Sequence, residues 1–341
     1  MKKYKVGIYG VGDVATEYMK AFNNNPLSEV VIAVDKDKIK TEKKITAMGL
    51  SCEVGTDYDE MIKRKDVDII VLSGPHFLHA KEAIKAANAG KHILSEKPLG
   101  MDFKEVSEVY GAIKNAGVQF QNSFVGEWYP YILNVKKLIS DGLLGKVFYL
   151  EADYMHNLDH WTTAWAWGVN KRSGGPSAPL IGGIHTIDII RVIGGEPIEV
   201  FAYQTWGHIK EYEYAPTYVA IIKFKDGVIG KTACSYEITA PYHTNFCFYG
   251  SKGTIRNEKF FLKETFPGQT DWQQFETVFV DSRLVSHHPF QPAIDDFIKA
   301  IADNKHKNIG NIEQTYKTHE LCYAIEKSME TGKIVKLPLT G

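Results

Sequence analysis

The feature of the sequence that most constrains its fold is a glycine turn at residues 10–15. The turn reads Gly-Val-Gly-Asp-Val-Ala and lies between an apolar run at residues 4–9 and a helical pattern that extends to about residue 23. The first glycine allows a tight turn, the second lets a pyrophosphate approach the backbone, and Ala15 keeps the helix close to the sheet. The helix dipole also places partial positive charge near the phosphates. The pattern predicts a dinucleotide-binding unit with cofactor contacts from Gly10, Val11, Gly12, Asp13 and Val14.

A carboxylate follows the second predicted strand. Asp35 comes directly after the apolar run at residues 29–34 and twenty residues after Ala15. A carboxylate at this point can accept a hydrogen bond from the 2′-hydroxyl of an adenine ribose. It would repel a 2′-phosphate by up to about 4 kcal/mol at roughly 4 Å in an effective dielectric of about 20. We therefore expect NAD, with Asp35 and Lys36 as cofactor contacts. The ammonium of Lys36 could offset the repulsion, which leaves NADP as the alternative.

The first part of the chain alternates short apolar runs with helical patterns. Such alternation predicts parallel strands joined by right-handed crossovers, and therefore a doubly wound α/β sheet. The predicted strands are residues 4–9, 29–34, 67–73, 92–95 and 118–122, and the later predicted helices are residues 79–89 and 103–116. These elements predict an N-terminal Rossmann domain at residues 1–122.

The second part of the chain has longer strands that meet through hairpin turns. Asp226-Gly227 separates apolar runs at residues 218–224 and 228–236, which is a strong signal for a β-hairpin. We expect an α/β domain at residues 123–341 with a large, open, mostly antiparallel sheet. One or two helices should pack on this sheet, and residues 313–330 are predicted to be helical.

Charge and composition exclude several classes of protein. Forty Lys and Arg residues against 41 Asp and Glu residues leave a formal charge of −1, which gives no electrostatic reason to bind nucleic acid or an anionic membrane. No apolar run in the sequence approaches the roughly 20 residues needed to cross a bilayer. The N-terminus has no long apolar stretch with a small-residue cleavage site, so we expect a cytoplasmic protein.

The cysteine and histidine patterns argue against a metal. The four cysteines are scattered and none forms a CxxC pair, so neither a disulfide scaffold nor a structural zinc site is expected. His156 and His160 could form a metal-binding pair, but no third ligand stands out. We therefore predict no metal site.

The motif Glu96-Lys97-Pro98 follows the predicted strand at residues 92–95. Ligands of open α/β sheets bind beyond the carboxyl ends of the strands, so Lys97 is expected in the ligand crevice. Together with this motif, the segments GVGDVA, VDIIVLSGPHFLHA, AGKHILSEKPLG and GGIHTIDII resemble the glucose–fructose oxidoreductase / inositol dehydrogenase / rhizopine catabolism (Gfo/Idh/MocA) family. The resemblance extends from about residue 4 to residue 338.

The resemblance implies a nicotinamide-binding Rossmann domain at the N-terminus and a C-terminal domain that binds substrate. It also implies a substrate that is a sugar, a cyclitol or a related polyol. The open C-terminal sheet of this family often mediates oligomers, which implies a homodimer or homotetramer.

The resemblance further implies roles for individual residues. Glu96 and Lys97 match the motif near the nicotinamide ribose and the reacting carbon, and His185 matches the family's active-site histidine. The loop expected to pass beneath the cofactor supplies Ser73, Gly74, Pro75, His76 and His79. The chain departs from the family at Ile181, where many members carry an Asp four residues before the histidine. It departs again at residues 127–130, where Glu-Trp-Tyr-Pro replaces an Arg-Phe-x-Pro-like segment.

Two of these residues suit the chemistry of alcohol oxidation. A hydride moves to C4 of the nicotinamide while a proton leaves the hydroxyl, so one group must hold the oxygen and another must take the proton. Lys97 can stabilise developing alkoxide charge, and His185 has an intrinsic pKa of about 6.5, which suits proton transfer at neutral pH. We assign His185 as the base and Lys97 as its electrostatic partner, and the reverse assignment stays open. Because Ile181 cannot accept a hydrogen bond, another group must orient His185.

Residues 155–179 form the predicted specificity loop. Aromatic faces suit the C–H surfaces of a sugar, and short polar groups suit its hydroxyls. The predicted substrate contacts, in this loop and elsewhere, are Trp128, Asp159, His160, Trp161, Arg172 and Asp188. Asp188 is included because it lies on the same helical face as His185. For any single tryptophan of the loop, the alternative is packing of the loop onto the sheet.

These inferences lead to three hypotheses. The first is an NAD(P)-dependent dehydrogenase that acts on CH–OH groups of a carbohydrate or polyol. The second is a glycosidase or lyase that uses a tightly bound NAD in a transient cycle of oxidation, elimination and reduction; Ile181 and Glu127 keep this alternative open. The third is a non-catalytic sensor of NAD or sugar, and the retention of Lys97 and His185 speaks against it.

Overall fold

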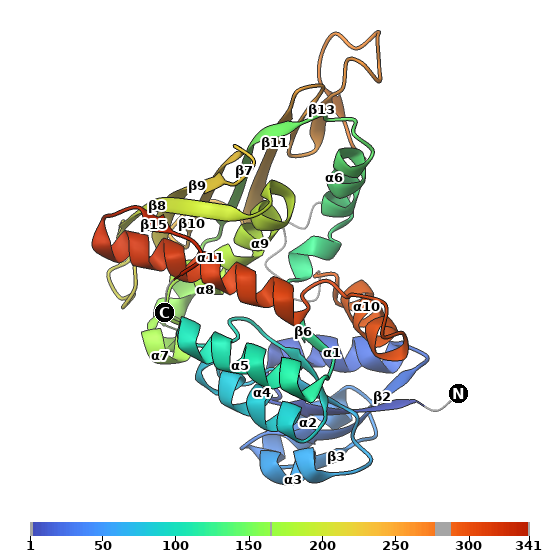
Figure 1. The fold of residues 1–341 in the computed structure, drawn as a ribbon. Coiled ribbons are helices and arrows are strands. Elements are labelled where there is room, and N and C mark those ends of the chain that lie inside the picture. The colour runs from blue at the N-terminus through green and yellow to red at the C-terminus, as the bar shows by residue number, and fades with distance from the viewer. Residues whose placement is uncertain (1–2, 164–165, 277–287, 340–341) are drawn as a thin grey trace. The chain divides into compact units, whose positions relative to one another are not determined.

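The structure is a computed structural model that describes residues 3–163, 166–276 and 288–339 (Figure 1). The contacts within the chain divide it into two compact units. Unit 1 comprises Met1–Phe124 and Pro289–Lys317, and unit 2 comprises Val125–His288 and Thr318–Gly341. Each unit has its own sheet and its own buried core.

Unit 1 contains a parallel sheet of six strands in the order β3-β2-β1-β4-β5-β6. Its strands are β1 (Tyr4–Tyr9), β2 (Ser28–Val34), β3 (Glu53–Gly55), β4 (Ile69–Leu72), β5 (His92–Ser95) and β6 (Phe120–Asn122). Its helices are α1 (Asp13–Asn24), α2 (Lys38–Ala47), α3 (Tyr58–Lys63), α4 (His79–Asn88), α5 (Phe103–Ala116) and α10 (Phe290–Ala302), with a 3₁₀ turn η1 (His76–Leu78). The strand order reverses at β1 and β4, which creates the switch point where such sheets bind ligands. The predicted doubly wound sheet is confirmed.

Local signals explain why the predicted boundaries in unit 1 lie close to the observed ones. All four residues of β4 are buried, as expected for an apolar strand covered on both faces. Helix α5 begins after Asp102, whose carboxylate accepts a hydrogen bond from the N–H of Glu105 at 2.8 Å. The helix ends at Gly117, whose φ of 66° is the left-handed conformation that favours glycine.

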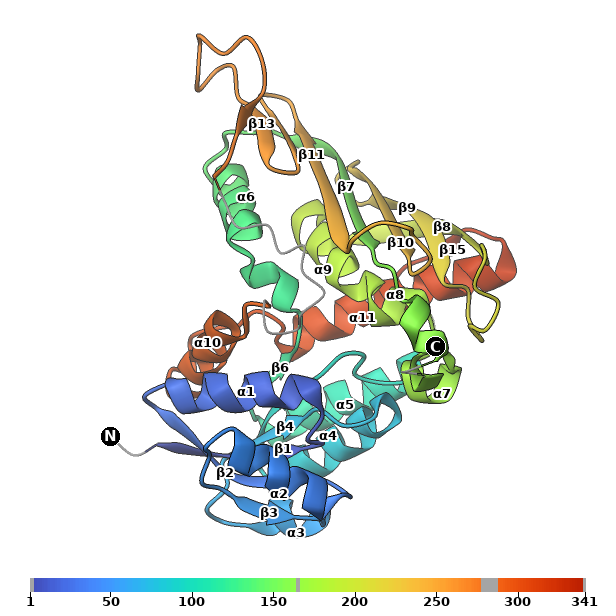
Figure 2. The ribbon, with the colours of Figure 1, turned by 180° about the vertical axis from the view of Figure 1, so that it is seen from behind.

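Unit 1 includes a segment that returns from far along the chain. Helix α10 lies beside α1 in both ribbon views (Figures 1 and 2), and the ring of Phe290 meets Tyr18 edge-on at 5.1 Å. The side-chain amide of Asn25 donates to Asp295 at 2.7 Å, and that of Gln121 donates to the carbonyl of Ala293 at 3.0 Å. The division expected from the sequence kept residues 123–341 together. The structure instead groups residues 289–317 with unit 1, because α10 packs its apolar face there.

Unit 2 contains a sheet of nine strands in the order β14-β13-β12-β11-β7-β10-β9-β8-β15. Its strands are β7 (Val147–Met155), β8 (Pro197–Thr205), β9 (Thr217–Phe224), β10 (Ile229–Ser235), β11 (His243–Gly250), β12 (Thr254–Arg256), β13 (Lys259–Phe261), β14 (Gln273–Gln274) and β15 (Val335–Lys336). The predicted hairpin is confirmed as β9 and β10, and its turn includes Gly227 with a φ of 82°. All pairs are antiparallel except β7 with β10, which run parallel.

Helices pack on one face of this sheet. Unit 2 contains α6 (Pro130–Ser140), α7 (Lys171–Gly174), α8 (Ala178–Ile181) and α9 (Gly183–Gly194), with 3₁₀ turns η2 (Val125–Trp128), η3 (Asp159–Thr162) and η4 (Ala166–Val169). Helix α11 (Ile312–Thr331) begins in unit 1, and its residues from Thr318 onward belong to unit 2. Helices α8 and α9 contact the strands. The hydroxyl of Ser328 in α11 accepts a hydrogen bond from the N–H of Ala202 in β8 at 2.9 Å, which fixes this helix on the sheet. Side chains on the other face are more exposed, with Tyr203 at 71% and Ile221 at 47%.

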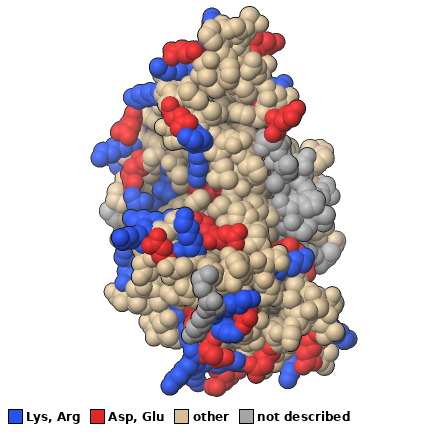
Figure 3. Space-filling model, turned by 90° about the vertical axis from the view of Figure 1, so that its right-hand side faces the viewer, with Lys and Arg blue, Asp and Glu red and all other residues tan. Residues whose placement is uncertain are grey.

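Among the described residues, no helix is both long enough and apolar enough to cross a membrane. On the face drawn in Figure 3, Lys and Arg side chains are interspersed with Asp and Glu side chains. This mixture agrees with the near-zero formal charge of the sequence.

Candidate functional site

The glycine turn between β1 and α1 can be formed only with a glycine at its first position. Gly10 has a φ of +85°, and a Cβ added to it would lie 2.4 Å from the backbone N and Cα of Gly74. The hydroxyl of Ser73 donates to the carbonyl of Gly10 at 2.7 Å and ties the two loops together. The expected requirement for Gly10 therefore comes from close backbone approach as well as from the turn.

The second glycine has a different environment. A Cβ on Gly12 would have no described atom within 4 Å, and the φ of Gly12 is −78°, which any residue adopts. Gly12 is the N-cap of α1, and no side chain of the described residues caps the helix there. The first turn of α1 therefore begins without a side-chain cap and with free space beside Gly12, which is an arrangement suited to binding a phosphate.

Lys44 is a residue of this turn that the sequence reasoning missed. Its ammonium donates to the carbonyl of Gly12 at 2.7 Å and lies 3.3 Å from a carboxylate oxygen of Asp13. Lys44 belongs to α2 and is 32 residues from Gly12 in the sequence, so no local pattern indicated the contact. The positive charge beneath the turn balances the exposed carboxylate of Asp13.

Asp35 lies where the glycine turn meets the end of β2. Its Oδ2 accepts the backbone N–H of Val11 at 2.8 Å, and its Oδ1 accepts the N–H of Asp37 at 3.1 Å. Each carboxylate oxygen has a second lone pair, so the group can still accept a bond from a ligand hydroxyl. Lys36 is exposed beside it.

His79 joins two loops of unit 1. Its ring is 1% exposed, with Nδ1 2.7 Å from the carbonyl of Pro98 and Nε2 3.0 Å from the carbonyl of Gly74. Burial lowers the pKa of this histidine. Because backbone carbonyls occupy both ring nitrogens, we do not retain His79 as a direct cofactor ligand. It supports the loop that carries Gly74, Pro75 and His76.

The segment after β5 is held by Glu96. The carboxylate of Glu96 accepts the hydroxyl of Tyr18 and, at 3.2 Å, the backbone N–H of Lys97. Burial raises the pKa of Tyr18, so its phenol stays protonated and donates. The hydroxyl oxygen of Tyr18 also lies 2.6 Å from Oγ of Ser123. Glu96 is therefore an anchor of this turn, and the half-buried Lys97 begins at a fixed backbone position.

His185 lies in the first turn of α9, in unit 2. Its ring stacks on that of Tyr154 with centroids 6.4 Å apart and planes at 26°. The two glycines before it are required by this packing. A Cβ on Gly182 would lie 2.6 Å from the ring of Tyr154, and one on Gly183 would lie 2.3 Å from the hydroxyl of Tyr218. The GGIH motif therefore lets α9 begin against aromatic rings.

A cluster of rings surrounds Tyr154, and the sequence reasoning did not identify it. The hydroxyl of Tyr154 lies 3.0 Å from Nδ1 of His156, and the ring of Tyr242 lies 5.2 Å from Tyr154 and 4.6 Å from His156. Tyr154 and His156 alternate along and just beyond β7, so they share a side of the strand. The spacing of two residues between Tyr154 and His156 is the sequence signal from which their shared side of the strand could be predicted. Ile181, in contrast, is buried as expected of an apolar residue.

Asp188 has no free carboxylate for a substrate. It is fully buried, its Oδ1 accepts the hydroxyl of Thr318 at 2.5 Å, and it is hydrogen-bonded to Glu127. The expected substrate contact is therefore not retained. The three-residue spacing places Asp188 on the same helical face as His185. At residue 188, however, this face of α9 packs into the core.

The residues predicted for substrate binding differ in exposure. Asp159, His160 and Arg172 are exposed, whereas Trp128 is buried. Trp161 is 9% exposed and packs tightly, because a Cβ on Gly168 would lie 2.2 Å from its indole. For Trp161 the structure therefore shows the loop-packing role that was the alternative. Trp165 lies outside the described residues.

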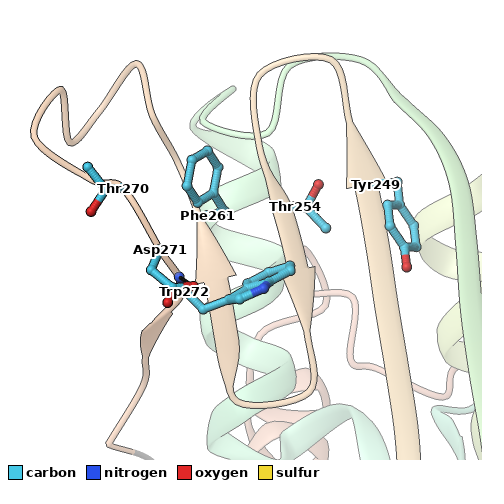
Figure 4. A pocket seen from close by; sticks show the side chains of 6 residues that line it. All are labelled: Tyr249, Thr254, Phe261, Thr270, Asp271 and Trp272. Carbon is cyan, nitrogen blue, oxygen red and sulfur yellow. Dashed lines mark hydrogen bonds between the residues drawn. The ribbon is translucent and has the colours of Figure 1, made fainter.

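A shallow hollow of about 350 Å³ lies elsewhere in unit 2 (Figure 4). Its lining comes from β11, β12, β13 and the segment before β14, and comprises Tyr249, Thr254, Phe261, Thr270, Asp271 and Trp272. None of these is a candidate site residue. Lys97 belongs to unit 1 and His185 to unit 2, so each is supported by the contacts of its own unit.

Comparison with known proteins identifies the class of this fold. Residues 4–124 match the model of an oxidoreductase family with an NAD-binding Rossmann fold, and residues 132–256 match the GFO/IDH/MocA C-terminal domain. The chain is therefore built as a Rossmann-type oxidoreductase with a second α/β domain. It belongs to the Gfo/Idh/MocA family.

The chain is similar to curated proteins with different names. A 2,7-anhydro-N-acetylneuraminate hydratase of Mediterraneibacter gnavus is 29% identical over 202 residues, which are 59% of this chain and 52% of that protein. The match thus spans about half the length of the hydratase. Trans-1,2-dihydrobenzene-1,2-diol dehydrogenase of Bos taurus is 25% identical over 250 residues, which are 72% of each chain.

Solved structures share the fold over the whole chain. Levoglucosan dehydrogenase, in complex with NADH and levoglucosan, superposes with a TM-score of 0.88 at 20% identity, covering 99% of this chain and 100% of that one. At this identity the likeness shows the fold.

Proposed function

We propose that this protein is an NAD(P)-dependent dehydrogenase that acts on a CH–OH group of a sugar, glycoside, cyclitol or related polyol. The observation that supports this most is the open first turn of α1 at Gly12 beside the carboxylate of Asp35. Phosphate and ribose hydroxyl are the groups that these two features recognise. The relatives named as diol and inositol dehydrogenases support the substrate class.

The residues of unit 1 fit a dinucleotide. Residues 10–14 would receive the pyrophosphate and Asp35 the adenine ribose, since the space above Gly12 is open and the glycine at position 10 is sterically required. When bound, the nicotinamide dinucleotide supplies the acceptor or donor of a hydride. The carboxylate of Asp35 favours NAD, and Lys36 keeps NADP as the alternative.

Lys97 and His185 are proposed to handle the alcohol oxygen and its proton. Lys97 donates a hydrogen bond to the oxygen and stabilises negative charge that develops on it. His185 takes the proton, and the stacked ring of Tyr154 limits the orientations of the imidazole. Tyr154 would then orient the imidazole of His185, a role that Ile181 cannot perform because it has no hydrogen-bonding group.

We also propose a homo-oligomer, as a dimer or tetramer, through the exposed face of the unit 2 sheet. Tyr203, Val219 and Ile221 expose 71%, 43% and 47% of their surface there. Neighbouring apolar side chains with such exposure are typical of an interaction surface. Sedimentation of the purified protein over a range of concentrations measures the assembly state.

The function is tested with a panel of sugars, glycosides, inositols and diols, each supplied with NAD or NADP. We expect one class to produce reduced cofactor, measured by its absorbance, with NAD used better than NADP. A released leaving group without accumulated NADH would instead favour the transient oxidation and elimination cycle. Binding of NAD or sugar without turnover across the panel would favour a sensor and contradict the proposal.

A further inference from the structure

Five side chains form a continuous polar chain in the core of unit 2. Nε of Arg191 donates to Oγ1 of Thr318 at 2.8 Å, and Oγ1 of Thr318 lies 2.5 Å from Oδ1 of Asp188. The carboxyl of Asp188 is hydrogen-bonded to that of Glu127, and Lys136 contacts Oε2 of Glu127. Asp188 is 0% exposed and Glu127 is 1% exposed, so water does not separate the two carboxyl groups.

The direction of each hydrogen bond in this chain is fixed by chemistry. A guanidinium can only donate, so Thr318 accepts from Arg191 and has one proton to give to Asp188. An ammonium can also only donate, so Glu127 accepts from Lys136. Both ends of the chain therefore deliver donors to the carboxyl pair. Two ionised carboxylates have no hydrogen with which to bond each other, so the contact between Asp188 and Glu127 needs a proton.

The surroundings place that proton on Asp188. Glu127 is the member of the pair that contacts the ammonium of Lys136, whereas Asp188 is 0% exposed and contacts the neutral hydroxyl of Thr318. Burial, and next the charge of Glu127, raise the pKa of Asp188 well above its usual range. Arg191 opposes this shift, but its nearest guanidinium nitrogen is 3.8 Å from Asp188.

The bonded pair joins two elements beside His185. Asp188 follows His185 by three residues, which is about one turn of α9. Glu127 follows Gly126, and a Cβ on Gly126 would lie 3.9 Å from the Cβ of His185. A bond between residues 127 and 188 therefore fixes the turn η2 against the part of α9 that carries the histidine.

We propose that Asp188 and Glu127 share one proton at neutral pH, and that the resulting bond makes them positioning residues for His185. The role of the pair in positioning His185 rests on the proposed function, whereas the shared proton does not depend on that function. The charged and titratable groups that face the pair are Lys136 of α6, Arg191 of α9 and Cys322 of α11, and His319 is buried on the same helix. When the proton is lost, two adjacent buried charges repel and the turn is released.

The shared proton is tested by infrared spectroscopy at pH 8. The wild-type protein should show the carbonyl stretch of a protonated carboxylic acid, and Asp188→Asn should lack that component. Glu127→Gln is the second variant, and it should shift the band, because the buried acid of Asp188 then bonds to an amide in place of a carboxylate. Glu326→Gln is the control and should retain it. Identical spectra for the wild type and both pair variants would overturn the proposal.

Unfolding gives an independent measure of the same proton. Asp188 is protonated when folded and ionised when unfolded, so its unfolding above about pH 5 releases one proton. Each increase of one pH unit should therefore multiply the unfolding equilibrium constant of the wild type by a factor about ten times larger than the factor for Asp188→Asn. Equal slopes would show that the folded pair holds no extra proton, which would overturn the proposal.

Positioning is tested with the two substitutions at residue 188 on an active substrate. The amide of Asp188→Asn can donate to Glu127 and accept from Thr318, whereas Asp188→Ala can do neither. We expect Asp188→Ala to lose at least tenfold in kcat with the KM for the cofactor kept, and Asp188→Asn to recover most of it. Equal kcat for the wild type and Asp188→Ala would overturn the positioning role. A panel without activity would overturn the proposed function, and the infrared result would still decide the proton.

Discussion

The backbone N–H of Val11 donates a 2.8 Å hydrogen bond to Oδ2 of Asp35. One carboxylate thus holds the glycine turn and also marks the position expected for the adenine ribose. A substitution of Asp35 would therefore remove its hydrogen bond to the turn together with its proposed role in the choice of cofactor.

Asp35→Ala should weaken NAD binding and reduce the preference for NAD over NADP. A lost hydrogen bond to a charged group costs about 1.5–3 kcal/mol, or roughly tenfold to a hundredfold in Kd. The measurement is titration of both cofactors by intrinsic fluorescence. Asp37→Ala is the control. The carboxylate of Asp37 caps α2 by accepting a hydrogen bond from the backbone N–H of Lys40 at 2.9 Å, so its loss should lower stability without changing the preference for NAD over NADP. An unchanged NAD/NADP ratio in Asp35→Ala would show that the carboxylate does not face the ribose.

The two glycines of the turn should respond differently to alanine. Gly12→Ala has open space for its methyl group, so the protein should keep its stability but lose cofactor affinity by at least about tenfold. Gly10→Ala clashes with backbone at 2.4 Å and requires a φ of +85°, so it should lower the free energy of unfolding by about 2 kcal/mol or more. Thermal unfolding and NAD titration separate the two effects. Normal NAD binding by Gly12→Ala would contradict the pyrophosphate site.

Lys97→Ala should lower turnover by more than about a hundredfold while nearly preserving the Kd for the cofactor. The reason is that the ammonium is proposed to stabilise charge that appears only during the reaction. The exposed Lys104, 3.8 Å from Glu108, provides the matched control, and Lys104→Ala should behave as wild type. Near-normal kcat in Lys97→Ala would remove the lysine from the proposed chemistry.

Tyr154→Leu should lower kcat more than Tyr154→Phe, because phenylalanine keeps the ring that stacks on His185. The phenylalanine variant loses the contact with His156 at 3.0 Å, which is worth about 1 kcal/mol, or less than about tenfold. Tyr212→Phe is a control in the same unit. The pH–rate profile is the informative readout, since a reoriented base shifts the profile and simple destabilisation does not. Equal losses in both Tyr154 variants would assign the effect to the hydroxyl instead.

Glu326→Gln should stabilise the protein at alkaline pH and leave it unchanged near pH 4. Burial raises the pKa of Glu326 in α11 to about 7. The folded state therefore holds the proton more tightly than the unfolded state, and the wild type loses stability as the pH rises from the unfolded pKa to about 7. The loss is on the order of 3 kcal/mol. Urea unfolding at pH 4 and pH 8 measures it, with the exposed Glu211→Gln as control. A pH-independent difference would show that Glu326 titrates normally when folded.

Much of the fold was predictable because its signals are local. The turn at residues 10–15, the hairpin at Asp226-Gly227 and the cap at Asp102 each depend on a few adjacent residues. The predicted helix at residues 103–116 and the strand at residues 92–95 have the observed bounds. The candidate residues after β1, β2 and β5 could also be named, because parallel strands bring their carboxyl ends to one edge of a sheet.

Other features could not be predicted because they depend on distant partners. Nothing in the sequence near α10 indicates that it joins unit 1, and the parallel pairing of β7 with β10 joins strands about 80 residues apart. Asp188 was expected to face a substrate, since helical spacing places it near His185. Its burial depends on Glu127, 61 residues earlier, and on Thr318 from another helix.

The boundary between the two units falls within α11, directly after Lys317, and α10 precedes that helix by a short loop. Neither unit is therefore a continuous stretch of sequence. An exchange of residues 1–124 with a relative would replace Tyr18 and Gln121 but leave their partners Phe290 and Ala293 behind. Inheritance of the N-terminal unit as a working module thus requires that a segment encoded much later in the gene be inherited with it.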